Sequence, residues 1–199
     1  GYIGNRPNPQ NPHGWKQWHR LVLNNLQHGD VVPRPADRWQ RHGIAMPQRR
    51  HGSKILLTAP DEKPCVFYGI KLEEWIDQTV ATIRQHTDRE IVIRERNPNR
   101  QARVANDLQS ALVDVHAVVT FNSIAATESI MAGVPAFVLA PCNAALPVSN
   151  TDLSKIESPW YPSRDFIEIW LSHLAYCQFS NQELADGTAL RILQETNNA

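Results

Sequence analysis

The chain has 199 residues, of which 42% are hydrophobic, and this length suits one domain or one domain with part of a second. Its 20 basic and 20 acidic residues give zero formal net charge, which argues against binding of nucleic acid or an anionic membrane through the whole surface. No apolar run approaches the roughly 20 residues of a membrane span and no signal peptide is visible, so we expect a cytoplasmic protein without a membrane span.

Residues 1–52 differ in composition from the rest of the chain, because proline, asparagine, histidine, arginine and tryptophan are frequent there. Only residues 17–26 have helical character, and the low apolar content argues against a free-standing domain. We predict an irregular segment that is a linker or the remnant of a preceding domain. Its basic residues form either a solvated face or a contact for phosphate groups; they are Arg38, Arg41, Arg49, Arg50 and His51.

Regular alternation of strands and helices begins at Ser53. Apolar runs predict strands at 54–59, 90–94, 117–121 and 135–140, and helical spacing predicts helices at 71–86, 103–112, 124–132 and 164–176. Residues 60–64 read as a turn and 65–68 as a short extended piece. A long loop with one helical turn near 151–156 follows the last strand. A capping box at Ser180 opens a final helix that ends near Gln194.

This order of elements predicts an α/β fold over residues 53–199. Strands that alternate with helices are typical of a Rossmann-like parallel sheet with helices on both faces. We therefore expect two parts, an irregular N-terminal segment at 1–52 and a Rossmann-like domain at 53–199.

The stretch 117–140 predicts a strand, a polar turn, a short helix and a second strand. Asn122 and Ser123 are natural N-cap residues, and the following N–H groups of Ile124 and Ala125 lie where open α/β sheets bind anions. Glu128 lies five residues after Ser123 and could accept hydrogen bonds from a ribose diol. The alternative is structural: Ser123 only caps the helix, and Glu128 only favours its first turns.

Two arginines lie at the carboxyl end of the strand predicted at 90–94. Residues two positions apart on an extended chain point the same way, so Arg94 and Arg96 could form a clamp for phosphate groups. In a parallel sheet this strand end faces the same edge as Ser123. The alternative is a pair of surface arginines partnered by Glu90 or Glu95.

The loop at 141–162 is long for a connection inside a compact domain, and such loops are often functional. Its polar side chains could contact a hydroxyl-rich ligand or could only form turns. The candidates are Asn143, Ser149, Asn150 and Asp152.

Other common site signatures are absent from the sequence. It contains no nucleophile elbow, Walker loop, G-x-G-x-x-G or zinc motif. Cys65, Cys142 and Cys177 are scattered, which predicts free thiols and no metal site. The histidines show no metal-ligand spacing.

Two motifs together resemble the carboxyl-terminal domain of GT-B glycosyltransferases. The first is IVIRERNP at 91–98, and the second is V-V-T-F-N-S-x4-E-S-x3-G-V-P-A-F-V at 118–138. The resemblance covers roughly 53–195 and is nearest to the capsular-polysaccharide synthesis type and to small glycosyltransferase-like proteins of tailed phages. The second motif also resembles that of GT-B-fold epimerases. The capsular family often has a Lys-x-His-Pro signature after the basic strand, and this chain lacks that histidine.

The resemblance implies a metal-independent glycosyltransferase whose nucleotide-sugar donor binds to this domain as substrate, with no cofactor. Ser123 and the amides after it would contact the donor phosphates together with the Arg94 and Arg96 pair, and Glu128 would contact the ribose or sugar. The acceptor would be a hydroxyl of a saccharide or of a modified DNA base. Asp152 and His19 are hypotheses for the general base.

A GT-B enzyme has two Rossmann-like domains, whereas about 50 residues precede the donor-like part here. We therefore expect that a first domain is missing or is supplied by a partner chain. The alternatives to a transferase are a nucleotide-sugar epimerase of the same fold and a non-catalytic nucleotide-binding, sugar-binding or assembly module.

Overall fold

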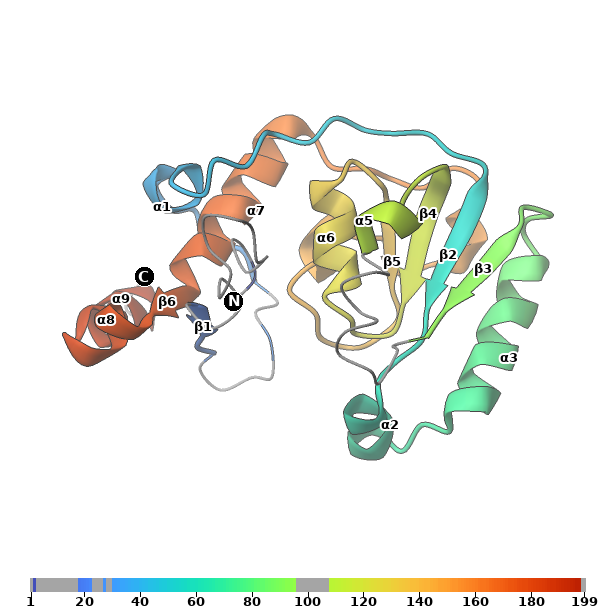
Figure 1. Ribbon diagram of the computed structural model, residues 1–199, viewed down its shortest axis with the longest axis horizontal. Coiled ribbons are helices and arrows are strands. Elements are labelled where there is room, and N and C mark those ends of the chain that lie inside the picture. The colour runs from blue at the N-terminus through green and yellow to red at the C-terminus, as the bar shows by residue number, and fades with distance from the viewer. Residues whose placement is uncertain (1, 3–17, 23–26, 28–29, 96–107, 198–199) are drawn as a thin grey trace. The chain divides into compact units, whose positions relative to one another are not determined.

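The computed structural model describes residues 2, 18–22, 27, 30–95 and 108–197 (Figure 1). They form two compact units. The sheet unit comprises residues 47–162, and the terminal unit comprises the described parts of 1–46 and 163–199. The helices after residue 162 thus group with the N-terminal segment, whereas we expected them in one domain with the sheet.

The sheet unit alternates strands and helices as predicted. Its strands are β2 (Lys54–Thr58), β3 (Ile91–Arg94), β4 (Val115–Thr120) and β5 (Ala136–Val138). Its helical elements are α2 (Glu62–Tyr68), α3 (Leu72–Arg84), α5 (Leu108–Ala111), α6 (Ala125–Met131), and the 3₁₀ turns η2 (Leu146–Val148) and η3 (Leu153–Lys155). The four predicted strands are confirmed, as are the helix at 71–86 and the turn near 151–156. Of the helix expected at 103–112, residues 103–107 lie outside the described residues.

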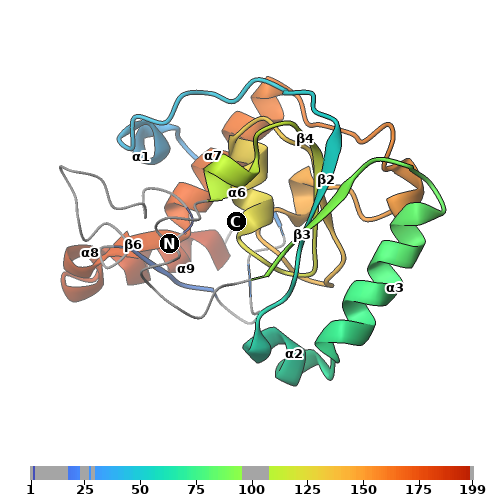
Figure 2. The same ribbon diagram turned by 45° about the vertical axis from the view of Figure 1, so that its right-hand side comes forward.

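The four strands form one parallel sheet in the order β3-β2-β4-β5 (Figure 1), and α3 lies beside it (Figure 2). β2 is central, because Leu56 lies beside both Val92 of β3 and Val118 of β4. Every residue of β4 is buried, as expected for a parallel strand that is covered on both faces. The predicted Rossmann-like α/β fold is confirmed for this unit.

Alternate residues of the strands fill two separate cores, because successive side chains on a strand point to opposite faces. One face packs against α3 and η3, and its buried residues are Ile55, Leu57, Ile83, Ala117, Val119, Phe137, Leu153 and Ile156. The other face packs against α5 and α6, and its buried residues are Leu56, Leu108, Leu112, Val115, Val118, Ala125 and Val134. Helices therefore cover both faces of the sheet and leave its edges for other contacts.

Residues 65–68 are helical in α2, so the prediction of an extended piece is wrong. Pro64 is the third residue of this helix, where a missing N–H is tolerated because first-turn N–H groups have no partner within the helix. Gly69 ends the helix in the left-handed conformation, with φ of 65°, and its N–H bonds the carbonyl groups of Cys65 and Val66. Proline thus suggested a turn at a position that is compatible with a helix.

The terminal unit combines segments from both ends of the chain. β1 (Trp18–Arg20) pairs antiparallel with β6 (Gln178–Ser180), and His19 lies opposite Phe179. Its helices are α1 (Asp37–Gln40), α7 (Arg164–Tyr176), α8 (Asn181–Ala185) and α9 (Thr188–Asn197). The helix predicted at 17–26 is wrong at Trp18–Arg20, because pairing with a distant strand overrides the local pattern.

The last two helices agree in part with the sequence. α7 has the predicted bounds, and the predicted capping box joins Ser180 and Glu183 at the start of α8. The single final helix is instead two helices, separated at Gly187, whose φ is 83°.

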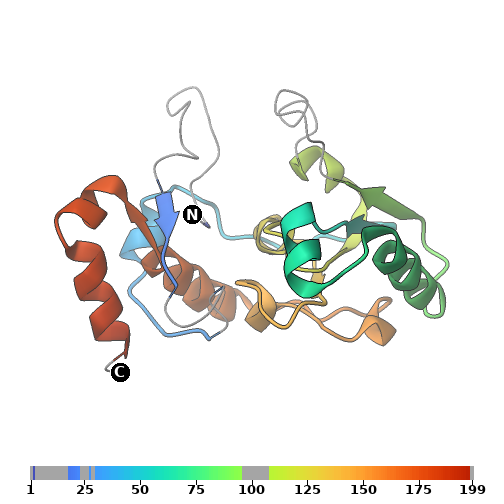
Figure 3. The ribbon, with the colours of Figure 1, turned by 90° about the horizontal axis from the view of Figure 1, so that it is seen from below.

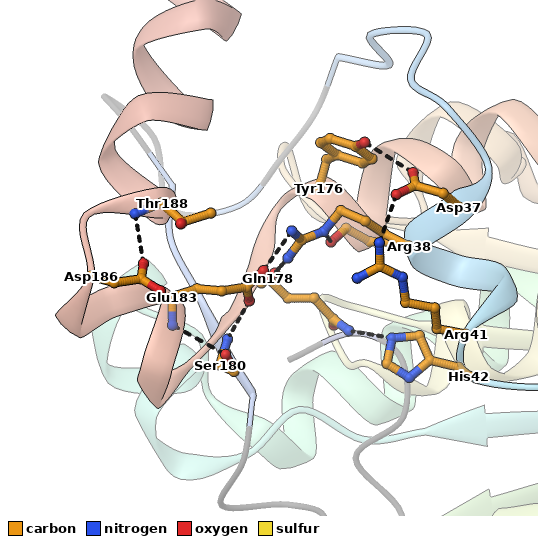
Figure 4. A network of polar contacts seen from close by, with 11 residues as sticks. Asp37, Arg38, Arg41, His42, Tyr176, Gln178, Ser180, Glu183, Asp186 and Thr188 are labelled. Atoms are coloured by element: carbon orange, nitrogen blue, oxygen red, sulfur yellow. Dashed lines mark hydrogen bonds and ion pairs between the residues drawn. The ribbon is translucent and has the colours of Figure 1, made fainter.

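Arg38 ties α1 to the segment that follows α7 (Figure 4). Its side chain is 10% exposed, and Nη1 lies 2.6 Å from Oε1 of Glu183. Its other donors bond the carbonyl groups of Ala175 and Gln178, each at 3.0 Å. Burial by itself would raise the pKa of Glu183, but the bonds from Arg38 and Ser180 outweigh burial and lower that pKa. Arg38 is therefore the centre of a mostly buried ionic network.

We predict that Arg38→Ala lowers the free energy of unfolding of the terminal unit by about 3 kcal/mol at pH 7, because Glu183 is left largely buried without its partner. The folded-state pKa of Glu183 is lowered, so the pair contributes fully above the unfolded pKa of about 4.3. That contribution is lost as the pH falls through the folded pKa. Urea denaturation at several pH values should therefore show the variant and the wild type converging in acid.

Arg41→Ala is the matched control, since Arg41 forms an exposed pair with Asp37 at 3.0 Å. We expect a loss below about 1 kcal/mol for this variant. Equal losses for the two variants at pH 7 would contradict the assignment of Arg38 as the centre of the network.

Gly133 follows α6 and lies against the backbone of residues 48–50, at the start of the sheet unit. Its φ is 85°, its carbonyl accepts the N–H of Arg50 at 2.7 Å, and an added Cβ would overlap the carbonyl oxygen of Gln48 at 1.9 Å. Only glycine fits this close backbone approach without displacement.

We predict that Gly133→Ala destabilises the protein at least twice as much as Gly69→Ala in thermal or urea unfolding. Both substitutions place a Cβ at positive φ, which costs roughly 1–2 kcal/mol. Only Gly133 adds a backbone overlap, because nothing lies within 4 Å of the corresponding position at Gly69. A similar loss at both positions would show that the Gln48 segment moves aside easily.

Candidate functional site

The carboxyl ends of the four strands meet at one edge of the sheet, which Figure 3 shows from below with α2 in front. Arg94, Thr58 and Thr120 end β3, β2 and β4, and they occupy neighbouring registered positions. Registered neighbours in a parallel sheet present their side chains to the same face. One guanidinium and two hydroxyls therefore form a row across this edge.

The two threonines of this row also join β2 to β4. The hydroxyl of Thr120 bonds the carbonyl of Thr58 at 3.3 Å, and the hydroxyl of Thr58 bonds the carbonyl of Val119 at 3.4 Å. Both threonines are buried, so these bonds satisfy groups that are costly to bury alone. The hydroxyls make the end of each strand polar without interrupting the sheet.

The turn from β4 to α6 has its shape set by side-chain hydrogen bonds. The N–H of Ser123 bonds the hydroxyl of Thr120 at 3.3 Å, and the hydroxyl of Ser123 accepts the N–H of Ala125 at 3.2 Å. Ile124 holds the N-cap position itself. The cap was expected at Asn122 or Ser123, so Ser123 lies one residue before the observed cap, and its hydroxyl can still donate a bond to a ligand.

Asn143 joins this turn to the loop after β5. Its amide nitrogen donates to the carbonyl of Ser123 at 3.3 Å, and its oxygen accepts the N–H of Ala145 at 2.8 Å. Asn143 is 1% exposed, so both bonds are buried. Two predicted site residues, Ser123 and Asn143, therefore lie in contact. The contact joins the Asn143 side chain to the Ser123 backbone, so it supports the turn.

Three further candidates near this turn are described by the structure, and one is not. Asn122 and Glu128 are half-buried, and Arg94 is half-buried at the end of β3. Thr127, next to Glu128, is fully buried, and its hydroxyl has no hydrogen-bond partner among the described residues. Arg96 lies outside the described residues, so of the two predicted arginines the structure describes Arg94 alone.

Two of the remaining loop candidates, Asn150 and Asp152, form hydrogen bonds within the loop or to the strand before it. The amide of Asn150 donates to the carbonyl groups of Ala136 and Trp160 and accepts the N–H of Trp160, at 2.9 to 3.1 Å. Asp152 caps η3 through Ser154, and these bonds lower the pKa of Asp152, which makes it a weaker base. Ser149 has a buried hydroxyl without a hydrogen-bond partner among the described residues.

The same loop is fixed at the opposite, amino edge of the sheet. Glu157 accepts two bonds from Nε of Arg89, at 3.0 and 3.1 Å, and one from the hydroxyl of Thr87, just before β3. His116, in the first half of β4, contacts the carbonyl of Ile156 through Nε2 at 2.9 Å. Residues 152–157 therefore belong to the amino side, and Ser123 and Asn143 belong to the carboxyl side.

His19, the second hypothesis for the general base, belongs to the terminal unit. Its Nε2 lies 2.7 Å from Oδ1 of Asn181. This contact joins β1 to the first residue of α8.

An aromatic cluster at the carboxyl edge was not predicted. It comprises Phe67 and Tyr68 of α2, Trp75 of α3 and Phe121, and we call it the edge aromatic cluster. The Tyr68 hydroxyl lies 3.7 Å from Sγ of Cys142, and burial followed by this contact raises the pKa of Tyr68. The sequence signal was the adjacent Phe67 and Tyr68 after a strand, which the prediction of an extended piece obscured.

Comparison with protein-family models, curated proteins and solved structures finds no match to this chain. Within the described part of the chain, no three histidine, cysteine or acidic side chains group as metal ligands would. No helix there is long and apolar enough to cross a bilayer.

We predict that Asn143→Ala lowers the free energy of unfolding by about 1–3 kcal/mol, because the Ser123 carbonyl and the Ala145 N–H lose a buried partner. Ser123→Ala should cost less, since Ser123 is only half-buried and its hydroxyl accepts one bond. Urea denaturation of both variants tests this order. A larger loss for Ser123→Ala would contradict the central structural role of Asn143.

Proposed function

We propose that the sheet unit binds a nucleotide-sugar at its carboxyl edge and is the donor-binding part of a metal-independent glycosyltransferase of the GT-B type. The observation that carries the proposal is the position of Arg94, whose register through Thr58 with Thr120 places it at the same strand-end edge as the hydrogen-bonded Ser123 turn. Ligands of open α/β sheets bind outside the carboxyl ends of the strands, and donor phosphates require cationic and neutral hydrogen-bond donors. The motif at 118–138 supports the same assignment.

In the proposed reaction, an acceptor hydroxyl attacks the anomeric carbon of the donor sugar and loses its proton to a general base. The bond from that carbon to the phosphate oxygen breaks, and the nucleoside phosphate leaves with the electron pair. Arg94 would stabilise the negative charge that develops on this leaving group, because a guanidinium forms bidentate hydrogen bonds with phosphate. Ser123 would donate a hydrogen bond from its hydroxyl to a phosphate oxygen.

Glu128 would hold the hydroxyls of the ribose or sugar. A carboxylate accepts two hydrogen bonds from a diol, and Glu128 follows Thr127 and the turn on α6. Binding of the donor and activation of the acceptor are then separate tasks, and the acceptor, a saccharide or a hydroxylated nucleic-acid base, binds to a first domain or to a partner chain.

We predict that calorimetry with UDP-, GDP- and CMP-sugars finds a bound donor. Ser123→Ala, Glu128→Gln and Arg94→Met should each weaken its binding about tenfold, which corresponds to about 1.4 kcal/mol. Asp152→Asn is the matched control and should leave the affinity unchanged, because Asp152 caps η3 through Ser154. Absence of binding to every donor, or the same affinity in all four variants, would refute the proposal.

Product analysis separates the alternatives. Release of free nucleotide with transfer of the sugar to an added acceptor indicates a transferase, whereas conversion to an isomeric nucleotide-sugar indicates an epimerase. Binding without either product identifies a non-catalytic module.

A further inference from the structure

The short helix α2 carries an aromatic side chain that the core does not use. α2 follows β2 at the carboxyl edge, and none of its seven residues is buried. Phe67 is 65% exposed and Val66 is 78% exposed. An exposed phenylalanine loses the free energy gained by burial, about 1.5–3 kcal/mol, so its place beside the candidate site is informative.

The ring of Phe67 is supported on one side by the edge aromatic cluster. Its centroid lies 4.9 Å from that of Tyr68, with the rings at 78°. Tyr68 in turn packs edge-on against Phe121 at 5.1 Å and contacts Cys142 through its hydroxyl. Tyr68 therefore holds this part of α2 against the end of β4.

The cluster leads directly to the proposed donor site. Phe121 immediately precedes Asn122 and Ser123, so two ring-to-ring steps connect Phe67 with the turn. In the proposed site Arg94 and the Ser123 hydroxyl are the donors for phosphates, and neither is an aromatic ring on which a base can stack. Phe67 supplies that missing surface at the same edge.

We propose that Phe67 forms the stacking surface for the nucleobase of the donor, an inference that rests on the proposed function. A base stacked on an aromatic side chain gains about 1–3 kcal/mol, independently of which base it is. Because Tyr68 meets Phe67 edge-on, it holds the Phe67 ring in place for stacking. The edge aromatic cluster then binds the base, and the turn at Ser123 binds the phosphates.

The test compares nucleotides with a ligand that has no base. Calorimetry on the full chain measures the affinities of UDP, GDP, CMP and inorganic pyrophosphate for the wild type, Phe67→Ala, Phe67→Trp and Val66→Ala. Phe67→Ala should weaken nucleotide binding about tenfold or more and leave pyrophosphate binding unchanged. Phe67→Trp, which keeps a stacking ring, and Val66→Ala, which removes exposed apolar surface from the same helix, should both bind like the wild type.

The outcomes separate this inference from the proposed function. If wild type and Phe67→Ala bind a nucleotide equally, the stacking surface is refuted and donor binding stands. If Phe67→Ala weakens pyrophosphate as much as nucleotide, or if Val66→Ala has the same effect, the role of the ring is also refuted. If no nucleotide binds to the wild type, both proposals fail.

Light scattering on the same proteins tests the competing explanation. If Phe67→Ala dissociates an oligomer without a change in nucleotide affinity, the exposed ring is a contact between copies of the chain and the inference is overturned.

Discussion

The parallel pairing of β2 with β4 is the interaction on which the sheet unit depends. Because these strands are covered by α3 on one face and by α5 and α6 on the other, their middle residues must be apolar. Polar side chains are tolerated where the strands end, because the hydroxyl of Thr120 bonds the carbonyl of Thr58 and the hydroxyl of Thr58 bonds the carbonyl of Val119. The burial that stabilises the sheet thus also restricts its polar side chains to the strand ends.

The two ends of the strands use polar groups differently. At the amino edge, Arg89 and Glu157 bond each other and fasten the long loop, so their charges serve stability. At the carboxyl edge, hydrogen bonds among Thr120, Ser123 and Asn143 fix the backbone, while Arg94 and Glu128 flank that scaffold on β3 and α6. A turn that is fixed by its own hydrogen bonds holds its polar groups in place before any ligand binds.

The terminal unit is held by interactions between the two ends of the chain. Arg38 contacts α7, β6 and α8 through one guanidinium, and β1 adds a backbone pairing to β6. A single buried arginine with three acceptors can join α1 and α8, which have few buried residues of their own, to the well-buried helix α7. This explains how a proline-rich segment with low apolar content adopts defined structure where it is described.

Local patterns in the sequence determined the four sheet strands, α3 and α7, because β-branched runs and helical spacing are short-range signals. They also placed Ser123 and Arg94 at one edge, since parallel strands end on the same side. Only the tertiary structure decided that Asn143 binds the Ser123 turn and that Trp18–Arg20 is a strand. It also brought Tyr68 and Phe121 together. These contacts join residues far apart in the chain, and a side chain gives no local sign of which distant group will satisfy it.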